Sequence, residues 1–214
     1  MGHKVNPTVF RLANRESGVD WESKWFVSKK DYPKLVVEDL KIREFLEGRL
    51  RSAGLVMIKI ERVGGKMKVI IVVARPGLVI GRGGKGLEEI KKALSKLVSV
   101  PDPEKDMELE VEEFKNADLS ARVVGQRIAD QLVRRMPYRR IINQAMNRVM
   151  AMGAKGVKIV LKGRINGIEI SRKEGFQRGQ VSLSTLREKI DYAQIPVLTR
   201  SGYIGLKVYI NRKA

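Results

Sequence analysis

The sequence contains no cysteine and a single histidine, His3. Without cysteine the chain can form no disulfide, no thiolate zinc site and no cysteine nucleophile. One histidine is too few for a histidine-based catalytic triad or a histidine-rich metal site. We therefore expect a protein that is not an enzyme and that uses no metal and no cofactor.

Long apolar runs are also missing. No stretch approaches 18 uninterrupted apolar residues, so we expect no transmembrane helix and no membrane partner. The opening MGHKVNPTVFRLANRE lacks the apolar centre of a secretory signal. Together with the lack of cysteine, these absences fit a reducing compartment such as the cytoplasm.

Acidic residues are in short supply. The chain has 43 lysines and arginines against 24 aspartates and glutamates, a net charge of +19. Such an excess attracts polyanions at long range and releases counterions when phosphates bind. It also works against compactness unless a partner neutralises it. We therefore predict a nucleic-acid partner; the alternative is a basic protein that is merely soluble.

The hydrophobic pattern divides the chain into a short arm and two α/β domains in series. The arm, residues 1–16, is basic and has little periodic pattern, so we expect it to lie against RNA or a neighbouring protein. The breaker VPDPEKD predicts a domain boundary near residue 105. The two predicted domains are therefore 17–105 and 106–214.

Both domains combine helices and strands. In the first we expect a helix over about 32–53, a hairpin turning at Gly64-Gly65, and a helix over about 84–98. In the second, MELEVEEF alternates like a strand, and helices follow over about 118–136 and 137–152. Further strand-like segments bounded by glycines are 156–162, 167–172 and 202–209.

The stretch RPGLVIGRGGKGLEEIKKAL contains two overlapping glycine patterns. Gly81, Gly83 and Gly86 form a G-x-G-x-x-G, but a dinucleotide loop needs a strand that runs straight into the first glycine. Pro76 ends the preceding strand too early, and that strand belongs to a hairpin. Strand, short helix, I-G-x-x-G and long helix is instead the order of a KH module, although a plain turn between two helices remains an alternative.

A KH loop of the G-x-x-G type clamps about four nucleotides by their backbone. Glycines let the chain approach the sugar-phosphate without a Cβ clash, and the following helix adds partial positive charge. The predicted RNA-binding residues of this loop are Arg75, Gly81, Arg82, Gly83, Gly84 and Lys85.

Four stretches together resemble one family, the bacterial or organellar form of small-subunit ribosomal protein three. They are MGHKVNP, ARPGLVIGRGGKGLEEI, RRMPYRRIINQAM and GRINGIEISRKEGFQRGQVSLSTLREKIDYA, in the family's order and across nearly the whole chain. The resemblance implies an α+β fold. It implies an N-terminal type II KH domain, followed by a second α/β domain with two helices packed on a small mixed sheet.

The resemblance also implies a function. A member of this family is a structural constituent of the small-subunit head, binds 16S-type rRNA and neighbouring head proteins, and lines the channel by which mRNA enters. We expect the same here, in a single copy rather than a homo-oligomer, on the ribosome of a cytoplasm or of an organelle. A free-standing KH-domain regulator of RNA is the alternative.

The basic residues of the second half fit this expectation. From 122 to 148 there are seven arginines and one acid, Asp130, so few of these cations can be paired within the helices. In the resembling family, basic residues at the start of the second helix grip entering mRNA. Arg139 and Arg140 match them, whereas Asn143 stands at a position that is often basic.

The remaining predicted RNA contacts share only their charge. Around the helices they are Arg134, Arg135, Arg139, Arg140 and Arg148; in the arm they are Lys4 and Arg11; in GRINGIEISRKEGFQRGQ they are Arg164, Arg172, Lys173 and Arg178. The acidic run 102–113 is not predicted to bind metal, because its alternating glutamates fall on the outer face of one strand.

Overall fold

The computed structural model describes residues 4–12, 14, 18–98 and 106–213. The chain forms two compact units. The first unit is Trp21–Lys115, and the second joins Met1–Asp20 to Asn116–Ala214. Residues 100–105 of the predicted breaker VPDPEKD and the single histidine lie outside the described residues.

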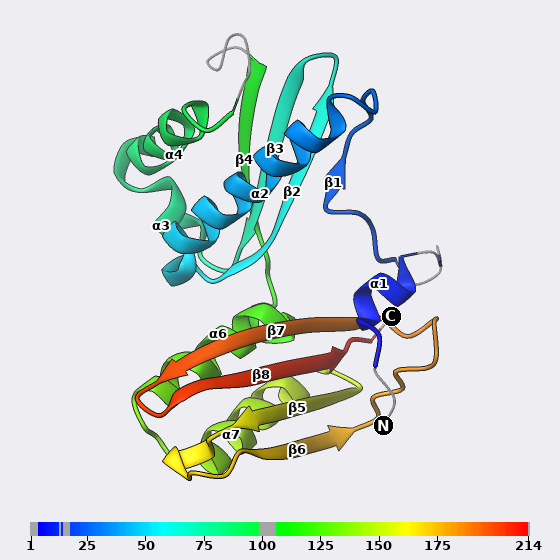
Figure 1. Cartoon of the computed structure of the whole chain (residues 1–214), viewed down its shortest axis with the longest axis vertical. Coiled ribbons are helices and arrows are strands. Elements are labelled where there is room, and N and C mark those ends of the chain that lie inside the picture. Colours follow the sequence, from blue (N-terminus) through cyan, green and yellow to red (C-terminus); the bar gives the residue numbers. More distant parts are fainter. Residues whose placement is uncertain (1–3, 13, 15–17, 99–105, 214) are drawn as a thin grey trace. The chain divides into compact units, whose positions relative to one another are not determined.

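The first unit is a four-stranded sheet in the order β1-β2-β3-β4 with helices on it (Figure 1). The strands β2 and β3 are antiparallel, whereas β1 runs parallel to β2 and β4 runs parallel to β3. The strands are β1 (Ser23–Lys24), β2 (Leu55–Val63), β3 (Lys66–Val73) and β4 (Met107–Glu113). The helices are α2 (Tyr32–Arg49), α3 (Pro76–Ile80) and α4 (Lys85–Ser95), with 3-10 turns η2 (Arg51–Ala53) and η3 (Arg82–Gly84).

The predicted elements of this unit are present. Gly54 ends the first helical stretch in the left-handed conformation at φ 72°, which glycine adopts without steric cost. The core joins one face of the strands to the helices, through Ile58 and Ile60 of β2 and Ile42 and Leu46 of α2, all nearly fully buried.

The predicted domain boundary at 105 is wrong. The MELEVEEF strand is β4, and it pairs with β3 in register from Met67↔Met107 to Val73↔Glu113. The edge of β3 would otherwise expose a row of unpaired backbone groups. A parallel neighbour needs a long crossover, and the segment from α3 to the breaker provides it. The boundary between the compact units therefore falls after Lys115.

The second unit is a four-stranded sheet in the order β6-β5-β8-β7. Its strands are β5 (Gly156–Gly163), β6 (Arg172–Gly179), β7 (Ile190–Thr199) and β8 (Gly202–Asn211). Its helices are α1 (Pro7–Arg11), α6 (Ala121–Val133) and α7 (Tyr138–Ala151), with 3-10 turns η4 (Ala117–Leu119) and η5 (Ile165–Gly167). Figure 1 shows α6 and α7 behind this sheet.

The α+β fold is confirmed, but two details of the second sheet differ from the prediction. Every neighbouring pair of strands is antiparallel, so the sheet is not mixed; short turns connect antiparallel strands directly. The segment expected as a strand at 167–172 is a loop, and the strand begins at Arg172. The strand β7 was not predicted; it is an edge strand, where its Pro196 is tolerated.

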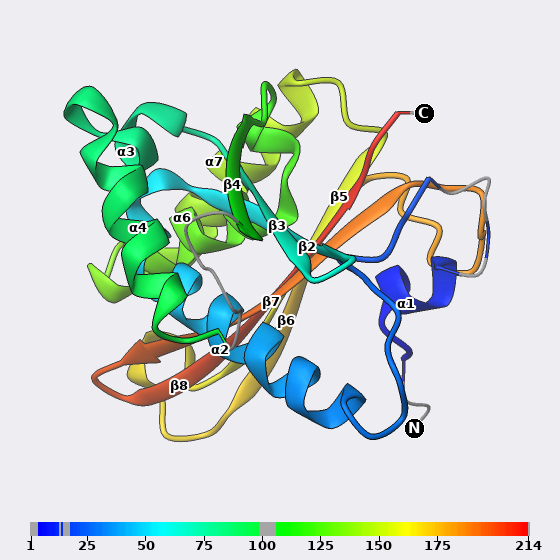
Figure 2. The same cartoon turned by 90° about the horizontal axis from the view of Figure 1, so that it is seen from above.

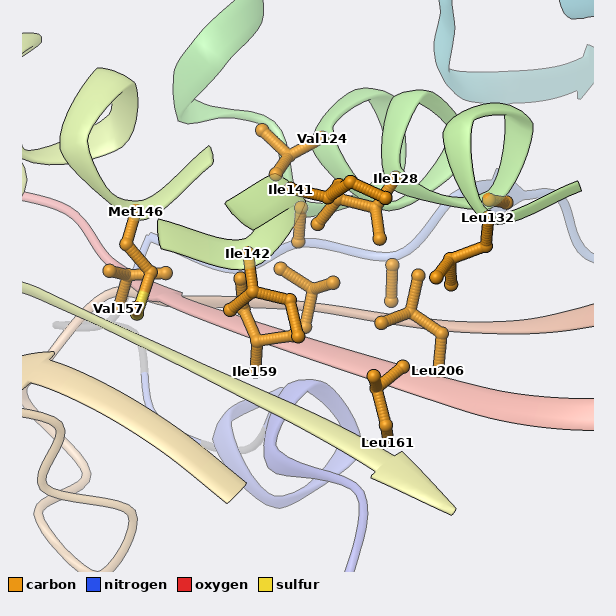
Figure 3. Packing of buried hydrophobic residues seen from close by; sticks show 14 of the residues in the cluster. Val124, Ile128, Leu132, Ile141, Ile142, Met146, Val157, Ile159, Leu161 and Leu206 are labelled. Atoms are coloured by element: carbon orange, nitrogen blue, oxygen red, sulfur yellow. The ribbon is translucent and has the colours of Figure 1, made fainter. Parts of the chain in front are cut away.

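The core of the second unit lies between the sheet and the two helices (Figure 3). Alternate residues of β5, namely Val157, Ile159 and Leu161, are fully buried and face Ile142 of α7 and Ile128 of α6. The helix α6 begins after Ser120, whose side chain accepts a hydrogen bond from the Val123 amide. Asp118, in η4 just before this helix, pairs with Arg127.

The predicted RNA contact of Arg11 is contradicted by its burial. Arg11 has no exposed surface, and α1 packs beside β7. Its guanidinium donates hydrogen bonds of 2.8–3.2 Å to five backbone carbonyls, those of Pro7, Ser182, Leu183, Thr185 and Glu188. Burial lowers the pKa of the Arg11 guanidinium, and the Glu188 carboxylate opposes that shift.

The N-terminal arm is anchored to the second unit by the buried Arg11 rather than by apolar packing. Val9 and Phe10 of α1 are 58% and 47% exposed, so hydrophobic burial contributes little to docking the arm, and the buried Arg11 guanidinium holds it through carbonyl oxygens. Arginine suits this place because its planar guanidinium presents five N–H donors. The arm is therefore part of the second unit from α1 onwards, with Lys4 still exposed on it.

We expect Arg11→Met to destabilise the second unit by about 3 kcal/mol or more, because it leaves buried carbonyl groups without donors. Hydrogen exchange read by mass spectrometry should show faster exchange in α1 and at residues 182–188, with β2 and β3 unchanged. Arg200→Met is the control, since Arg200 is an exposed arginine of the same unit. Equal exchange in the two variants would contradict the anchoring role.

Candidate nucleic-acid interface

The glycine loop connects α3 to α4, which lie side by side (Figures 1 and 2). Gly83 and Gly84 have φ of 62° and 80°, and a Cβ at either position would meet open space. They are glycines because of this backbone conformation, and the loop backbone stays accessible. A Cβ at Gly86 would lie 2.6 Å from the Val79 carbonyl oxygen, so that glycine lets the two helices approach.

The strand before this loop excludes the dinucleotide interpretation. The strand β3 is antiparallel to β2 and ends at Val73, and α3 begins at Pro76. A dinucleotide loop would need a parallel strand leading directly into Gly81. Strand, short helix, glycine loop and long helix follow one another instead, as the KH interpretation predicted.

The loop combines charge with exposed apolar surface. Arg75, Arg82 and Lys85 are exposed, and no carboxylate pairs with them in the described part of the chain. Leu78 and Ile80 of α3 are 58% and 40% exposed beside the loop. The N-terminus of α4 adds partial positive charge. This arrangement is suited to holding a sugar-phosphate backbone while apolar side chains contact the bases.

A second group of cations lies where α6 passes into α7. Arg134 and Arg135 follow α6, and Arg139 and Arg140 are in the first turn of α7; all four are exposed. No described carboxylate forms an ion pair with any of them. Arg148, also exposed, is in the last turn of α7 beside a groove between the two helices that Arg127 and Gln144 also line.

Arg139 is held in place by its neighbour. Its guanidinium carbon lies 5.7 Å from the centre of the Tyr138 ring, and its Nε donates to the Tyr138 hydroxyl at 3.1 Å. That hydroxyl donates in turn to Glu174 of β6 at 3.1 Å. The hydrogen bond uses only the Nε of the guanidinium, and its two terminal nitrogens remain suited to forked binding of a phosphate.

Arg135 has a strained backbone. Its φ is 58°, one of two non-glycine positive values among the described residues. It ends α6 in the left-handed conformation that glycine normally takes, with its amide bonded to the Leu132 carbonyl at 3.0 Å. The Cβ of an ordinary residue costs roughly 1–2 kcal/mol in this conformation.

The four cations predicted in 163–180 do not form one surface. Arg164 donates to the carbonyls of Ile168 and Ser201 and so stabilises its loop. Arg172 and Lys173 are adjacent on β6 and face opposite sides of the sheet. Arg178 donates to Asn147 of α7. Strand alternation was the signal that would have separated Lys173 from Arg172 and Arg178, whereas Arg164 lies in the loop before the strand.

The sequence interpretation missed three lysines of the second sheet. Lys158, Lys162 and Lys207 share with Lys173 the face that α6 and α7 leave uncovered. The period-two alternation of GVKIVLKG could have indicated them, because its lysines alternate with the buried Val157, Ile159 and Leu161.

The described residues contain no cluster of three or more histidine, cysteine, aspartate or glutamate side chains that could hold a metal ion. No helix in them is long and apolar enough to cross a membrane.

Known protein families match both halves of the chain. A family model for the KH domain matches residues 41–119, and one for the C-terminal domain of ribosomal protein S3 matches residues 128–210. The KH match covers β2, β3, the glycine loop and β4, and so agrees with the observed extent of the first unit rather than with a boundary at 105.

Relatives match over nearly the full length. The small ribosomal subunit protein uS3 of Protochlamydia amoebophila is 46% identical over 212 residues, 99% of this chain and 95% of its own. That of Lactobacillus johnsonii is 43% identical over 213 residues, covering 99% and 91%. That of Persephonella marina is 42% identical over 210 residues, covering 98% and 89%. The chain belongs to the uS3 family of small ribosomal subunit proteins.

Proposed function

We propose that this uS3-family protein binds 16S-type rRNA in the small-subunit head and holds incoming mRNA with Arg139 and Arg140. The first part follows from family membership, since the relatives are small ribosomal subunit proteins. The second part rests on one observation: the first turn of α7 has two exposed arginines and no acid.

This placement is unfavourable for the helix itself. The N-terminus of a helix carries partial positive charge, so a cation there costs typically 0.3–1 kcal/mol. Arg134 and Arg135, just before α7, add like charge to the same region. The cations repel one another until an anion lies between them. A phosphate backbone supplies repeating anions, and arginine binds phosphate through two parallel hydrogen bonds.

Binding of mRNA by Arg139 and Arg140 involves no chemical reaction. Arg139, oriented over Tyr138, and Arg140 bind phosphates of single-stranded mRNA while translocation pulls the message inward. A strand that has left a hairpin can lie along both arginines with its phosphates bound, and while it is held there it does not pair again. Holding the opened strand therefore favours unwinding, and the energy comes from translocation. The family relatives are structural proteins, which suggests that the chain is not an enzyme.

Because Asn143 is uncharged, the start of α7 offers mRNA two arginines and no third cation one turn further along the helix. Asn143 is exposed on α7, one turn beyond Arg139 and Arg140. Arg148 does not replace the missing charge, because eight residues of helix place it about 12 Å further along the axis from Arg140. We therefore assign the contact with mRNA to the start of α7 and its preceding turn.

The partners follow from this role. We infer 16S-type rRNA, mRNA and neighbouring head proteins as partners, with one copy of the chain in each small subunit of a cytoplasmic or organellar ribosome. A free-standing KH regulator is the weaker candidate, because relatives named as ribosomal proteins match 98–99% of the chain and not the KH unit alone.

Charge reversal tests the grip. We expect Arg139→Glu with Arg140→Glu to slow translation through a stable mRNA hairpin more than through an unstructured message, because the opened strand is no longer held. Ribosomes that carry Arg200→Glu with Lys213→Glu are the control, since these are exposed cations of the same unit. The measurement is the time to traverse each template; equal slowing on both templates would refute the proposal.

Arg135 allows stability to be separated from binding. We expect Arg135→Gly to stabilise the second unit by about 1 kcal/mol, because glycine relieves the left-handed backbone. The same change should weaken binding of single-stranded RNA and lower the salt slope by roughly 0.7, one phosphate contact. Arg135→Ala should lose the same RNA contact without gaining stability. Arg135→Gly with undiminished RNA affinity would show that this arginine is not a contact.

A further inference from the structure

The sheet of the second unit has one covered and one open face. The helices α6 and α7 pack against Val157, Ile159 and Leu161 of β5 and against Leu206 and Val208 of β8 (Figure 3). Successive residues of a strand point to opposite faces, so the residues between these lie on the other face. The short helix α1 contacts this sheet at β7, at one end of the strands (Figure 1).

The strand register orders the open face into rows. Lys158 lies opposite Tyr209, Val160 opposite Lys207, and Lys162 opposite Gly205. On the other side of β5, Lys162 lies opposite Lys173 and Val160 opposite Gly175. Neighbouring strands are about 4.8 Å apart and alternate residues along a strand about 6.6 Å apart. Lys162, Lys173 and Lys207 therefore form one compact cationic group.

No strand residue on this face is acidic. All four strands are described, and the residues that their register assigns to the open face are Gly156, Lys158, Val160, Lys162, Lys173, Gly175, Gln177, Gly179, Ile190, Tyr192, Gln194, Pro196, Leu198, Tyr203, Gly205, Lys207, Tyr209 and Asn211. The Glu188 carboxylate of the loop before β7 lies at the α1 end of the strands, beside Asn211 and Lys155. The carboxylates of β6 and β7, Glu174 and Asp191, face the helices. The lysines of this face thus have no carboxylate in the sheet to neutralise them.

The first sheet shows that this is not a general property of the chain. Its open face carries Glu108, Glu110 and Glu112 of β4, and Lys68 lies 2.6 Å from Glu110 and 3.9 Å from Glu108. The hydrogen bond to Glu110 raises the pKa of the Lys68 ammonium. That face neutralises its own cations, whereas the face of the second sheet leaves them for a partner.

Two glycines flatten the centre of the cationic group. Gly175 and Gly205 stand inside strands, where glycine is unfavourable. Neither has a positive φ, and a Cβ would meet nothing within 4 Å at Gly175 and only the Lys162 carbonyl at 3.7 Å at Gly205. The fold would accept a side chain at both positions. Because Gly175 and Gly205 have no side chains, another molecule's backbone has space to approach the sheet there.

The two ends of the face differ. Near α1, Tyr192 and Tyr209 pack their rings together at 4.9 Å, and burial raises the pKa of both phenols. At the opposite end Tyr203 and Leu198 are 69% and 60% exposed. An accessible ring therefore stands beside the lysine group, and a nucleic-acid base can stack on it.

We propose that this open face, centred on Lys162, Lys173 and Lys207, binds a single-stranded segment of RNA. The lysines contact phosphates, the strand backbone passes over Gly175 and Gly205, and Tyr203 stacks on a base. An acidic protein is the alternative polyanionic partner for this face. The core of a protein interface is apolar and depleted in charge, whereas the centre of this face is lysine and glycine.

This inference is independent of the grip by Arg139 and Arg140. Those arginines belong to the helical layer, and the lysines lie on the face of the sheet that the helices do not cover. The second unit would then bind RNA on two sides, with arginine on the helical side and lysine on the sheet side.

The test uses the full chain and a fluorescent polyuridylate, with Arg139→Gln and Arg140→Gln as the background. In this background we expect Lys162→Gln, Lys173→Gln and Lys207→Gln to weaken binding at least tenfold at about 0.1 M salt. The slope of log K against log salt should fall by about 2, since each lost phosphate contact on a single strand contributes about 0.7.

The control removes the same charge elsewhere. Lys29→Gln, Lys30→Gln and Lys34→Gln change three exposed lysines of the first unit, and should leave affinity and slope nearly unchanged. Equal losses in the two triple variants would overturn the proposal, because net charge alone would then explain them. Unchanged RNA affinity with lost binding of polyglutamate would overturn it in favour of an acidic protein partner.

The glycines give a second readout that keeps every lysine. Gly175→Val with Gly205→Val should leave the melting temperature unchanged or higher, because valine favours strands and the space is open. The same variant should bind polyuridylate at least tenfold more weakly, because the side chains block the approach of the backbone. A stable variant with full affinity would refute the proposed path of the strand. The Arg139 and Arg140 hairpin experiment is unaffected by either result.

Discussion

One constraint governs both units: each sheet is covered by helices on one face only. The apolar residues of a strand alternate with polar ones, so a single helical layer completes the core, as Ile58 and Ile60 show in the first unit and Ile159 and Leu161 in the second. The residues of the opposite face do not belong to these helix-covered cores. In the first sheet they include Lys68, which pairs with Glu108 and Glu110, and in the second they include lysines with no acidic strand residue on the same face.

A high count of cations does not by itself identify the RNA-binding surface. Arg11 is the clearest case, because this fully buried arginine holds the N-terminal arm on the second unit through five carbonyl groups. Arg62 of the first unit is also mostly buried, between Glu38 and Asp39. The informative cations are those left exposed and unpaired at a local cost, such as Arg139 beside the positive end of α7 and Arg135 in a left-handed backbone.

Local patterns predicted most elements but not their partners. The hairpin of β2 and β3, the glycine loop and the two helices of the second unit followed from periodicity, glycine and proline, which act over a few residues. The strand β4 was placed in the wrong unit, because a breaker loop looks the same whether it ends a domain or forms a crossover. The strand β7 was not predicted, and only the strand order shows that it lies at an edge, where Pro196 is tolerated.

The sequence by itself determined the class of the protein, its cationic character and the KH loop. Composition, charge and the glycine spacing are properties of neighbouring residues, and the resemblance to a ribosomal family rests on them. Only the tertiary structure decided which cations are available. Whether Arg11 meets carbonyl groups or solvent depends on residues 182–188, far along the chain. Whether Lys162, Lys173 and Lys207 form one group depends on strand register, which pairing and packing set together.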